Sequence, residues 1–224
     1  MNPFLLLVLS YLLGAVPTSY WVGRVFYGVD LRREGSGNLG ATNSFRVLGW
    51  KAALPVMLVD VGKGFVPVWA FPRMDLPEAA WSWALAYGAA AILGHVFSVW
   101  VRFRGGKGVA TSAGVFLALA PWAVLAAFVA WLVVVAATRI VSLASVVAAL
   151  VAPLAVWLLG PGPGGGVLLS FTVALAAFVV WAHRSNLGRL LRGEENRISP
   201  AHRNGGGGSG SSEAAEGHAA GNAP

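Results

Sequence analysis

A polar stretch at residues 94–112, GHVFSVWVRFRGGKGVATS, has the residue types needed to bind an anion. Gly105, Gly106 and Gly108 leave backbone N–H groups unshielded and can adopt positive φ angles, so the turn can close as a concave nest. Lys107 adds a positive charge. A helix is predicted over residues 109–119, and the positive end of its dipole would face the same anion. The stretch therefore predicts a site for a phosphate or a phosphate ester.

This stretch has two other possible interpretations, a simple cytoplasmic turn, which stays open, and a nucleotide P-loop, which the sequence disfavours. Between two membrane helices, GGKG could be only a tight cytoplasmic turn with anchoring cations. A nucleotide P-loop requires Ser or Thr directly after its lysine, whereas Gly108 follows Lys107 here. A soluble NTPase is therefore disfavoured.

A second cluster lies at residues 35–49, GSGNLGATNSFRVLG. Its glycines would let the backbone approach a ligand, its polar side chains would supply hydrogen bonds, and Arg46 would suit a bidentate phosphate contact. The alternative is an interfacial turn followed by a helix that Thr42 or Asn43 caps. The candidate binding residues of this cluster are Gly35, Ser36, Gly37, Asn38, Gly40, Thr42, Asn43 and Arg46.

The third and fourth clusters are TRIVSLAS at 138–145 and HRSNLGRLLRGEENR at 183–197. In the last of these, His183 and Asn186 are three residues apart and could form a base with its orienting amide, although an interfacial histidine is often only solvated. His95 is a second candidate base. Ser142 and Ser145 could present hydroxyl groups to the same cavity, but Ser142 could equally be a helix N-cap.

Asp60 and Lys63 lie within an apolar segment, three residues apart and so on one helical face. Charges are costly in lipid, and we expect these two to be paired or to face the site. A structural pair is the favoured interpretation, with direct contact to a substrate as the alternative.

The composition is that of a polytopic membrane protein. Of 224 residues, 57% are hydrophobic and 11% are charged, and the mean hydropathy is +0.68. The net charge of +7 comes from cations beside hydrophobic segments, so topology and anionic lipid or substrate explain it better than nucleic acid. With no cysteine and four histidines, the sequence predicts no disulfide, no metal site and no cofactor.

The hydrophobic segments predict an all-α membrane protein of about seven spans, with the N-terminus outside and the C-terminus in the cytoplasm. The expected spans are 2–25, kinked by Pro17, then 52–71 and 79–93, two short passes within 109–138 broken near Pro121, and finally 142–159 and 167–182. Cation-rich loops mark the cytoplasmic side, and all four polar clusters then face it. Residues 1–203 would form the membrane domain, and 204–224 a disordered Gly/Ser/Ala-rich tail.

These clusters together resemble a known family, the bacterial membrane acyltransferases of the PlsY type. GSGNLGATNSFRVLG resembles the first motif of that family, GHVFSVWVRFRGGKGVAT its second, and RIVSLAS with HRSNLGRLLRGEEN its third region. LVDVGKG at 58–64 resembles the family's Asp and Lys in the second span. The sequence departs from the pattern at Ser98, where the family commonly has Pro, and at Arg104, which replaces a Lys.

The resemblance implies an enzyme of the bacterial cytoplasmic (inner) membrane that transfers the acyl group of acyl phosphate to glycerol 3-phosphate. The products would be 1-acyl-glycerol 3-phosphate (lysophosphatidate) and phosphate, the first step of phospholipid synthesis, without coenzyme A or metal. By motif position, the glycerol phosphate and its reacting hydroxyl would be held by Ser36, Arg46, Lys107, Ser145, His183 and Asn186. The acyl phosphate would be held by backbone amides of Gly105, Gly106, Gly108, Val109, Ala110 and Thr111.

The chemistry needs little more than positioning, because acyl phosphate already has a good leaving group. The base could be His183 or the departing phosphate. A transporter for a phosphorylated solute is the rival class, but it would usually contain inverted repeats, which the sequence does not display. A structural scaffold would not need anion-binding turns. The sequence leaves the oligomeric state open.

Overall fold

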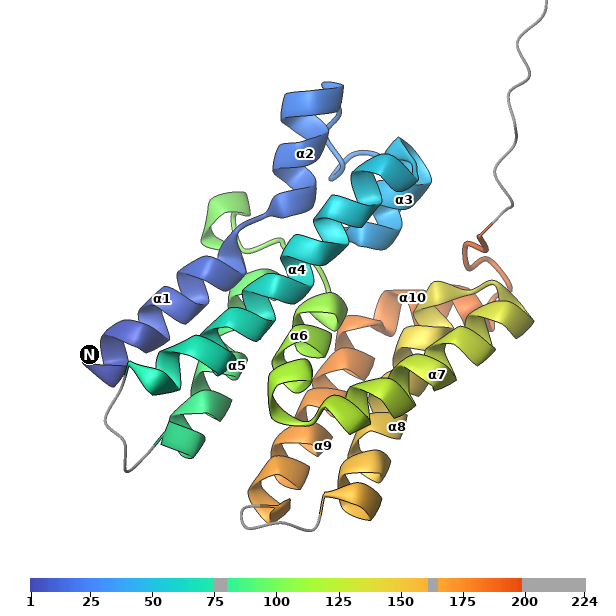
Figure 1. Ribbon diagram of the computed structural model, residues 1–224. Helices are drawn as coiled ribbons and strands as arrows, with labels where there is room; N and C mark the ends of the chain where they lie inside the picture. The colour runs from blue at the N-terminus through green and yellow to red at the C-terminus, as the bar shows by residue number, and fades with distance from the viewer. Residues whose placement is uncertain (75–79, 161–164, 199–224) are drawn as a thin grey trace, which may run out of the picture.

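A computed structural model describes residues 1–74, 80–160 and 165–198, and in these ranges it contains helices and loops but no strand (Figure 1). Two short 3-10 helices, η1 (Phe71–Arg73) and η3 (Val99–Val101), extend α4 and follow α5. The α-helices are α1 (Pro3–Ala15), α2 (Thr18–Tyr27), α3 (Ala41–Leu48), α4 (Trp50–Ala70), α5 (Ala80–Val96), α6 (Val109–Leu119), α7 (Pro121–Thr138), α8 (Val141–Leu159), α9 (Gly165–Ala182) and α10 (Arg184–Leu191).

The predicted all-helical membrane architecture is confirmed. Five helical stretches of the described chain are long and apolar enough to span a membrane, namely Trp50–Arg73, Ser82–Val101, Pro121–Thr138, Val141–Leu159 and Gly165–Ala182. The pair α1 and α2 passes the same test as one span with a bend of 41°. The bend is where the sequence predicted it, because Pro17 has no N–H with which to continue the hydrogen-bond ladder of α1.

The long apolar segment 109–138 is divided into two helices at the expected place. Ala120 leaves the helical conformation, with φ −151° and ψ 72°, and Pro121 opens α7. With 11 residues, α6 is about 16 Å long, roughly half of the ~30 Å hydrocarbon core. The total of seven spans therefore stays a prediction that depends on the depth to which α6 inserts.

Close helix pairs rely on glycines, which let backbones approach in a membrane protein. Gly14 of α1 faces α5, and a Cβ atom there would lie within 3.0 Å of the backbone of Ala91. Likewise, a Cβ atom at Gly64 of α4 would lie within 3.0 Å of the backbone of Thr111 in α6. These contacts draw α1, α4, α5 and α6 into one tightly packed group.

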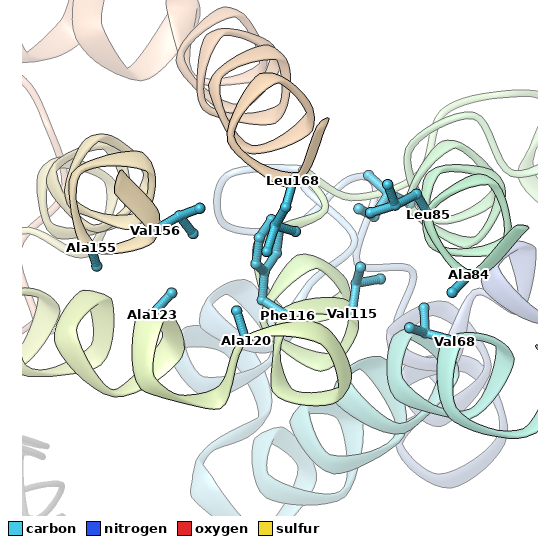
Figure 2. Close-up of a cluster of buried hydrophobic side chains, with 11 residues drawn as sticks. Val68, Ala84, Leu85, Val115, Phe116, Ala120, Ala123, Ala155, Val156 and Leu168 are labelled. Atoms are coloured by element: carbon cyan, nitrogen blue, oxygen red, sulfur yellow. The ribbon is translucent and has the colours of Figure 1, made fainter. Parts of the chain in front are cut away.

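Within that group, the helix α6 lies on the side that faces α7, α8 and α9 (Figure 1). Figure 2 shows Val115 and Phe116 of α6 in the middle of a buried apolar cluster, with side chains of α4 and α5 on one flank and of α7 and α8 on the other. The helix α6 therefore joins the two halves of the molecule. Its N-terminus follows directly on the glycine-rich stretch, so the core fixes the place of that stretch.

Candidate active site

A cleft of about 380 Å³ lies where the predicted polar clusters converge. It is formed at the end of the molecule where α2, α3 and α10 are found, away from the N-terminus of α1 (Figure 1). The predicted convergence of clusters one, two and four is therefore present in the structure. The residues that line the cleft are Ser36, Gly37, Asn38, Val96, Phe97, Phe103, Arg104, Gly105, Gly106, Lys107, Trp181, Ala182, Arg184, Ser185, Asn186 and Arg189.

The glycine turn, residues 105–108, differs from the predicted anion nest. The Gly105 N–H donates to the Val96 carbonyl at 2.9 Å and the Gly106 N–H to the His95 carbonyl at 3.1 Å. Of the three glycines, only Gly108 has a positive φ, 81°. The expectation that the Gly105 and Gly106 amides would hold a phosphate was therefore wrong, because these amides close the turn against the end of α5.

The backbone amides that follow the turn are better placed to receive an anion. The first N–H groups of an α-helix have no carbonyl partner within it, and in the part of the chain that the structure describes, those of Val109, Ala110 and Thr111 find no other. They do not line the cleft itself, whereas Lys107, two residues earlier, does. The anion-binding elements at the cleft wall are therefore the Lys107 side chain and, beyond it, the start of α6.

Lys107 belongs to a hydrogen-bond network that links the glycine turn to α10. Its Nζ donates to Asn186 Oδ1, and Asn186 Nδ2 donates to Glu195 Oε1 at 2.6 Å. Arg189 Nε reaches Glu195 Oε2 at 2.8 Å, and Ser142 Oγ donates to Oε1 at 2.8 Å. Glu195 is thus the centre of the network, and the sequence analysis had assigned it no role.

The electrostatics of this network favour anions. Burial lowers the pKa of Lys107 to about 8; Glu195 opposes that shift, and the charges of Arg189 and Arg46 reinforce it. Burial also lowers the pKa of Arg46. For Glu195, burial acts to raise the pKa, but hydrogen bonds from Asn186 and Ser142 and the charge of Arg189 lower it overall. One carboxylate therefore balances three cations, and the excess positive charge is available to a substrate.

His183 is buried at the N-terminus of α10. Its Nδ1 lies 2.8 Å from the Val179 carbonyl, which can only accept, so Nδ1 carries the proton and Nε2 keeps its lone pair. Burial, and next the charge of Lys107, lower the pKa of His183 to about 4. His183 does not line the cleft, but it is three residues from Asn186, which does. The histidine is therefore neutral near pH 7 and can accept a hydrogen bond there.

The loop of residues 31–40 is built around Asn43 of α3. Asn43 is buried; its Oδ1 accepts from the Ser36 N–H at 2.9 Å and from Ser36 Oγ at 3.1 Å. Its Nδ2 donates to the carbonyls of Leu31 and Glu34. Asn43 therefore shapes the loop and leaves Ser36 at the cleft. Gly35, Gly40 and Thr42 lie outside the lining, and the capping alternative was wrong, because α3 has Gly40 at its N-cap and no side-chain cap.

The two serines of the third cluster do not line the cleft. Ser142 contacts Glu195 and does not cap α8, whose N-cap is Ile140, so that alternative was wrong too. Ser145 Oγ donates to the Val141 carbonyl at 2.9 Å and accepts from Trp131 Nε1 at 3.3 Å. Ser145 therefore links α8 to α7, whereas Ser142 belongs to the network through its hydrogen bond to Glu195.

Asp60 and Lys63 form the expected buried pair, with Lys63 Nζ 2.7 Å from Asp60 Oδ1. His95, the second candidate base, lies beside this pair, its Nδ1 3.8 Å from the same oxygen. None of the three lines the cleft. The cleft therefore lies on one side of the glycine turn, and the buried cluster of Asp60, Lys63 and His95 lies on the other.

This chain is similar to known proteins in sequence and in fold. A family model for glycerol-3-phosphate acyltransferase matches residues 4–193. A glycerol-3-phosphate acyltransferase of Synechococcus sp. is 47% identical over 190 residues, covering 84% of this chain and 90% of the relative. One of Listeria monocytogenes serovar 1/2a is 44% identical over 199 residues, covering 88% and 97%.

Two crystal structures of PlsY, an integral membrane glycerol 3-phosphate acyltransferase, have the same fold. The glycerol 3-phosphate form has a TM-score of 0.81 and the lysophosphatidic acid form one of 0.78. Each is 36% identical to this sequence and covers 89% of this chain and 96% of its own. The chain belongs to the glycerol-3-phosphate acyltransferase family, of the PlsY type.

Proposed function

We propose that this protein transfers an acyl group from acyl phosphate to glycerol 3-phosphate and releases lysophosphatidate and inorganic phosphate. Family membership supports glycerol 3-phosphate as the acceptor, since the related crystal structures are of a glycerol 3-phosphate form and a lysophosphatidic acid form. The observation that carries the choice of donor is that cationic and aromatic side chains line the same cleft.

The two kinds of lining residue match the two ends of a fatty acyl phosphate. Lys107, Asn186 and Arg189 are polar or charged and have the excess of positive charge described above. Phe97 and Trp181 contribute aromatic rings to the same lining. Phe178 connects these aromatic rings, its centroid 6.3 Å from that of Phe97 and 5.7 Å from that of Trp181. A phosphate head would lie against the cationic side chains and an alkyl chain along the aromatic rings.

The reaction is an acyl transfer in which a hydroxyl oxygen of glycerol 3-phosphate attacks the carbonyl carbon of acyl phosphate. The bond from that carbon to the phosphate oxygen breaks, and phosphate leaves with the electron pair. Because phosphate is a good leaving group, the protein needs to hold two anions together and stabilise the developing charge. Lys107 provides that stabilisation at the cleft, and Arg46, which does not line the cleft, adds its charge from a greater distance, while Asn186 and Ser36 orient the polar groups.

The proton of the attacking hydroxyl goes to the departing phosphate. A general base is most effective when its pKa is close to the working pH, and the pKa of His183 is lowered to about 4. His183 is therefore a weak base, and since it does not line the cleft, its part is to hold the start of α10, and with it Asn186, in place. This favours the second of the two bases considered from sequence.

The direct test is turnover by the pure protein in detergent or lipid. With acyl phosphate and glycerol 3-phosphate, we expect lysophosphatidate and phosphate in equal amounts, and no product when acyl-coenzyme A replaces acyl phosphate. Product from acyl-coenzyme A alone would refute the proposed donor. Accumulation of glycerol 3-phosphate inside vesicles without product would instead support the rival transporter.

We also propose that the protein lies in the bacterial cytoplasmic (inner) membrane with the cleft facing the cytoplasm. The cleft end carries most of the cations, and this bias marks the cytoplasmic side. Since the sequence has no cysteine, single cysteines can report the topology. An impermeant thiol reagent should label Met74→Cys in intact cells and should label Arg33→Cys only after lysis. The reverse pattern would invert the orientation.

A further inference from the structure

A buried polar cluster lies on the side of the glycine turn that faces away from the cleft. It consists of Asp60 and Lys63 of α4, Thr18 at the start of α2, and His95 near the end of α5. The two charged side chains are only 2% and 3% exposed. None of these groups lines the cleft, and the reaction proposed above makes no use of them.

The cluster ties three elements together. Lys63 Nζ lies 2.7 Å from Asp60 Oδ1 and donates at 2.9 Å to the carbonyl of Val16, the residue at which α1 breaks before Pro17. Thr18 Oγ1, in the first turn after the break, donates to Asp60 Oδ1 at 3.3 Å. The ion pair therefore fixes the bend between α1 and α2 against α4.

His95 connects the ion pair to the glycine turn. Its Nδ1 is buried, lies 3.8 Å from Asp60 Oδ1 and has no hydrogen-bond partner among the described residues. A cavity of about 10 Å³ adjoins it, which is the space that a single water molecule needs, and a water there would hydrogen-bond to both atoms. On its other side, the carbonyl of His95 accepts the Gly106 N–H.

The glycine turn is the partition between the two regions. Gly105 and Gly106 line both the small cavity and the cleft. The contact on the buried side is close, because a Cβ atom at Gly106 would lie within 3.0 Å of the His95 ring and of the Leu39 carbonyl. A displacement of His95 therefore displaces the turn, and with it Lys107 and the start of α6.

We propose that Asp60, Lys63 and His95 are positioning residues that set the place of the glycine turn for the acyl phosphate. The inference rests on the proposed function, since it assigns the turn and the start of α6 to that substrate. The cluster contacts the turn on the side that faces away from the cleft, and it touches no substrate. Small displacements of a substrate-binding element are costly, and about 1 Å is enough to lose 10²-fold in rate.

The test is the double variant Asp60→Asn/Lys63→Met, which removes both charges but nearly preserves the side-chain volumes. Replacement of a buried ion pair by neutral groups is often tolerated, and Asn can still accept from Thr18. We expect the melting temperature in detergent to stay close to that of the wild type. We expect the KM for acyl phosphate to rise about 10-fold while the KM for glycerol 3-phosphate changes less than about 2-fold.

A control and a second pair of variants keep the result interpretable. Thr172→Val removes a buried hydroxyl that, among the described residues, bonds only to the Leu168 carbonyl of its own helix, and it should change neither KM. If the double variant does not fold, His95→Ala and His95→Gln serve instead, since both retain the ion pair. His95→Ala should raise the KM for acyl phosphate, and His95→Gln, which is closer in length, should restore most of the loss.

Two outcomes would overturn the inference. One is a folded double variant with unchanged KM for acyl phosphate, and the other is an equal loss for both substrates in proportion to the unfolded fraction. An inactive wild type would count against the proposed function alone. In that case the melting temperature can be measured with and without inorganic phosphate, whose binding at the turn should raise it. This rise should be smaller in the double variant than in the wild type, and Thr172→Val should leave it unchanged.

Discussion

Two glycine-rich segments border the cleft, and glycine serves a different purpose in each. In the loop of residues 31–40, Gly35 and Gly37 have φ angles of 61° and 69°, which side chains rarely allow. In the glycine turn, Gly105 and Gly106 have ordinary φ angles, but there is no space for a Cβ atom beside them. Gly37 of the loop is therefore needed for its conformation, whereas Gly105 and Gly106 of the turn are needed for their contacts.

The two segments also present different groups to a ligand. The loop presents side chains, because Asn43 satisfies its backbone and leaves Ser36 and Asn38 at the cleft. In the turn, the amides of Gly105 and Gly106 are occupied, and the charge of Lys107 faces the cleft. A glycine-rich motif is thus no direct evidence that its own amides bind the anion.

The largest effect is expected at Gly106. Gly106→Ala places a methyl group within 3.0 Å of the His95 ring and the Leu39 carbonyl, so the turn must move, and we predict a loss of about 10²-fold in kcat/KM. Gly62→Ala is the control, because a Cβ atom there would meet nothing within 4 Å. Near-normal kinetics of Gly106→Ala would show that space is not what the turn requires.

The charge on the turn gives a pH dependence that the loop cannot give. Lys107 has a pKa lowered to about 8, and its protonated form attracts the anionic substrates. Rising pH removes this charge, so kcat/KM should fall about 10-fold per pH unit above the pKa of Lys107 in the free enzyme. Lys107→Arg should hold its activity to higher pH, because arginine stays charged. Identical profiles for the two enzymes would assign the charge to another group.

A smaller effect, about 5-fold in kcat/KM, is expected at Gly37, where conformation is the constraint. Gly37 has a φ of 69°, and a Cβ atom would lie 3.1 Å from the Arg32 carbonyl. Asn tolerates the left-handed region better than Ala, so Gly37→Asn should be more active than Gly37→Ala. At Gly106 the order should reverse, since Asn is larger. The same order at both positions would remove the distinction between the segments.

The smallest effect concerns a third glycine-rich stretch, in the predicted tail at 204–224, which lies outside the described residues. Its composition provides no apolar face to pack against the helices. Deletion of residues 205–224 should therefore leave the specific activity of the purified enzyme within about 2-fold. A larger loss would mean that glycine has yet another use in this chain.

The sequence predicted the features that local chemistry decides. The helices follow from runs of apolar residues, and the breaks at 16–17 and 120–121 follow from Pro17 and Pro121, which have no N–H to donate. The pairing of Asp60 with Lys63 follows from the cost of isolated charges in lipid. Each of these predictions needs only the residue and its near neighbours in the chain.

The features that the sequence did not predict depend on partners that are distant in the chain. The Gly105 and Gly106 amides are occupied because α5 ends with two free carbonyls at their side, which no local pattern indicates. Ser145 is drawn away from the cleft by Trp131 of the neighbouring helix. One sequence feature could have indicated the central position of Glu195. It is an acidic residue within an arginine-rich segment, where a carboxylate is expected to pair with the arginines.

The place of Glu195 after the last membrane helix has a consequence for how the enzyme is made. A nascent chain can insert all of its apolar helices and still lack the carboxylate that Asn186, Arg189 and Ser142 share. A polypeptide that ends before this residue would remain in the membrane with an unfinished site. We therefore expect activity to require the chain as far as Ile198, whose N–H still bonds to the Arg139 carbonyl, and a fusion partner or affinity tag should be attached beyond it.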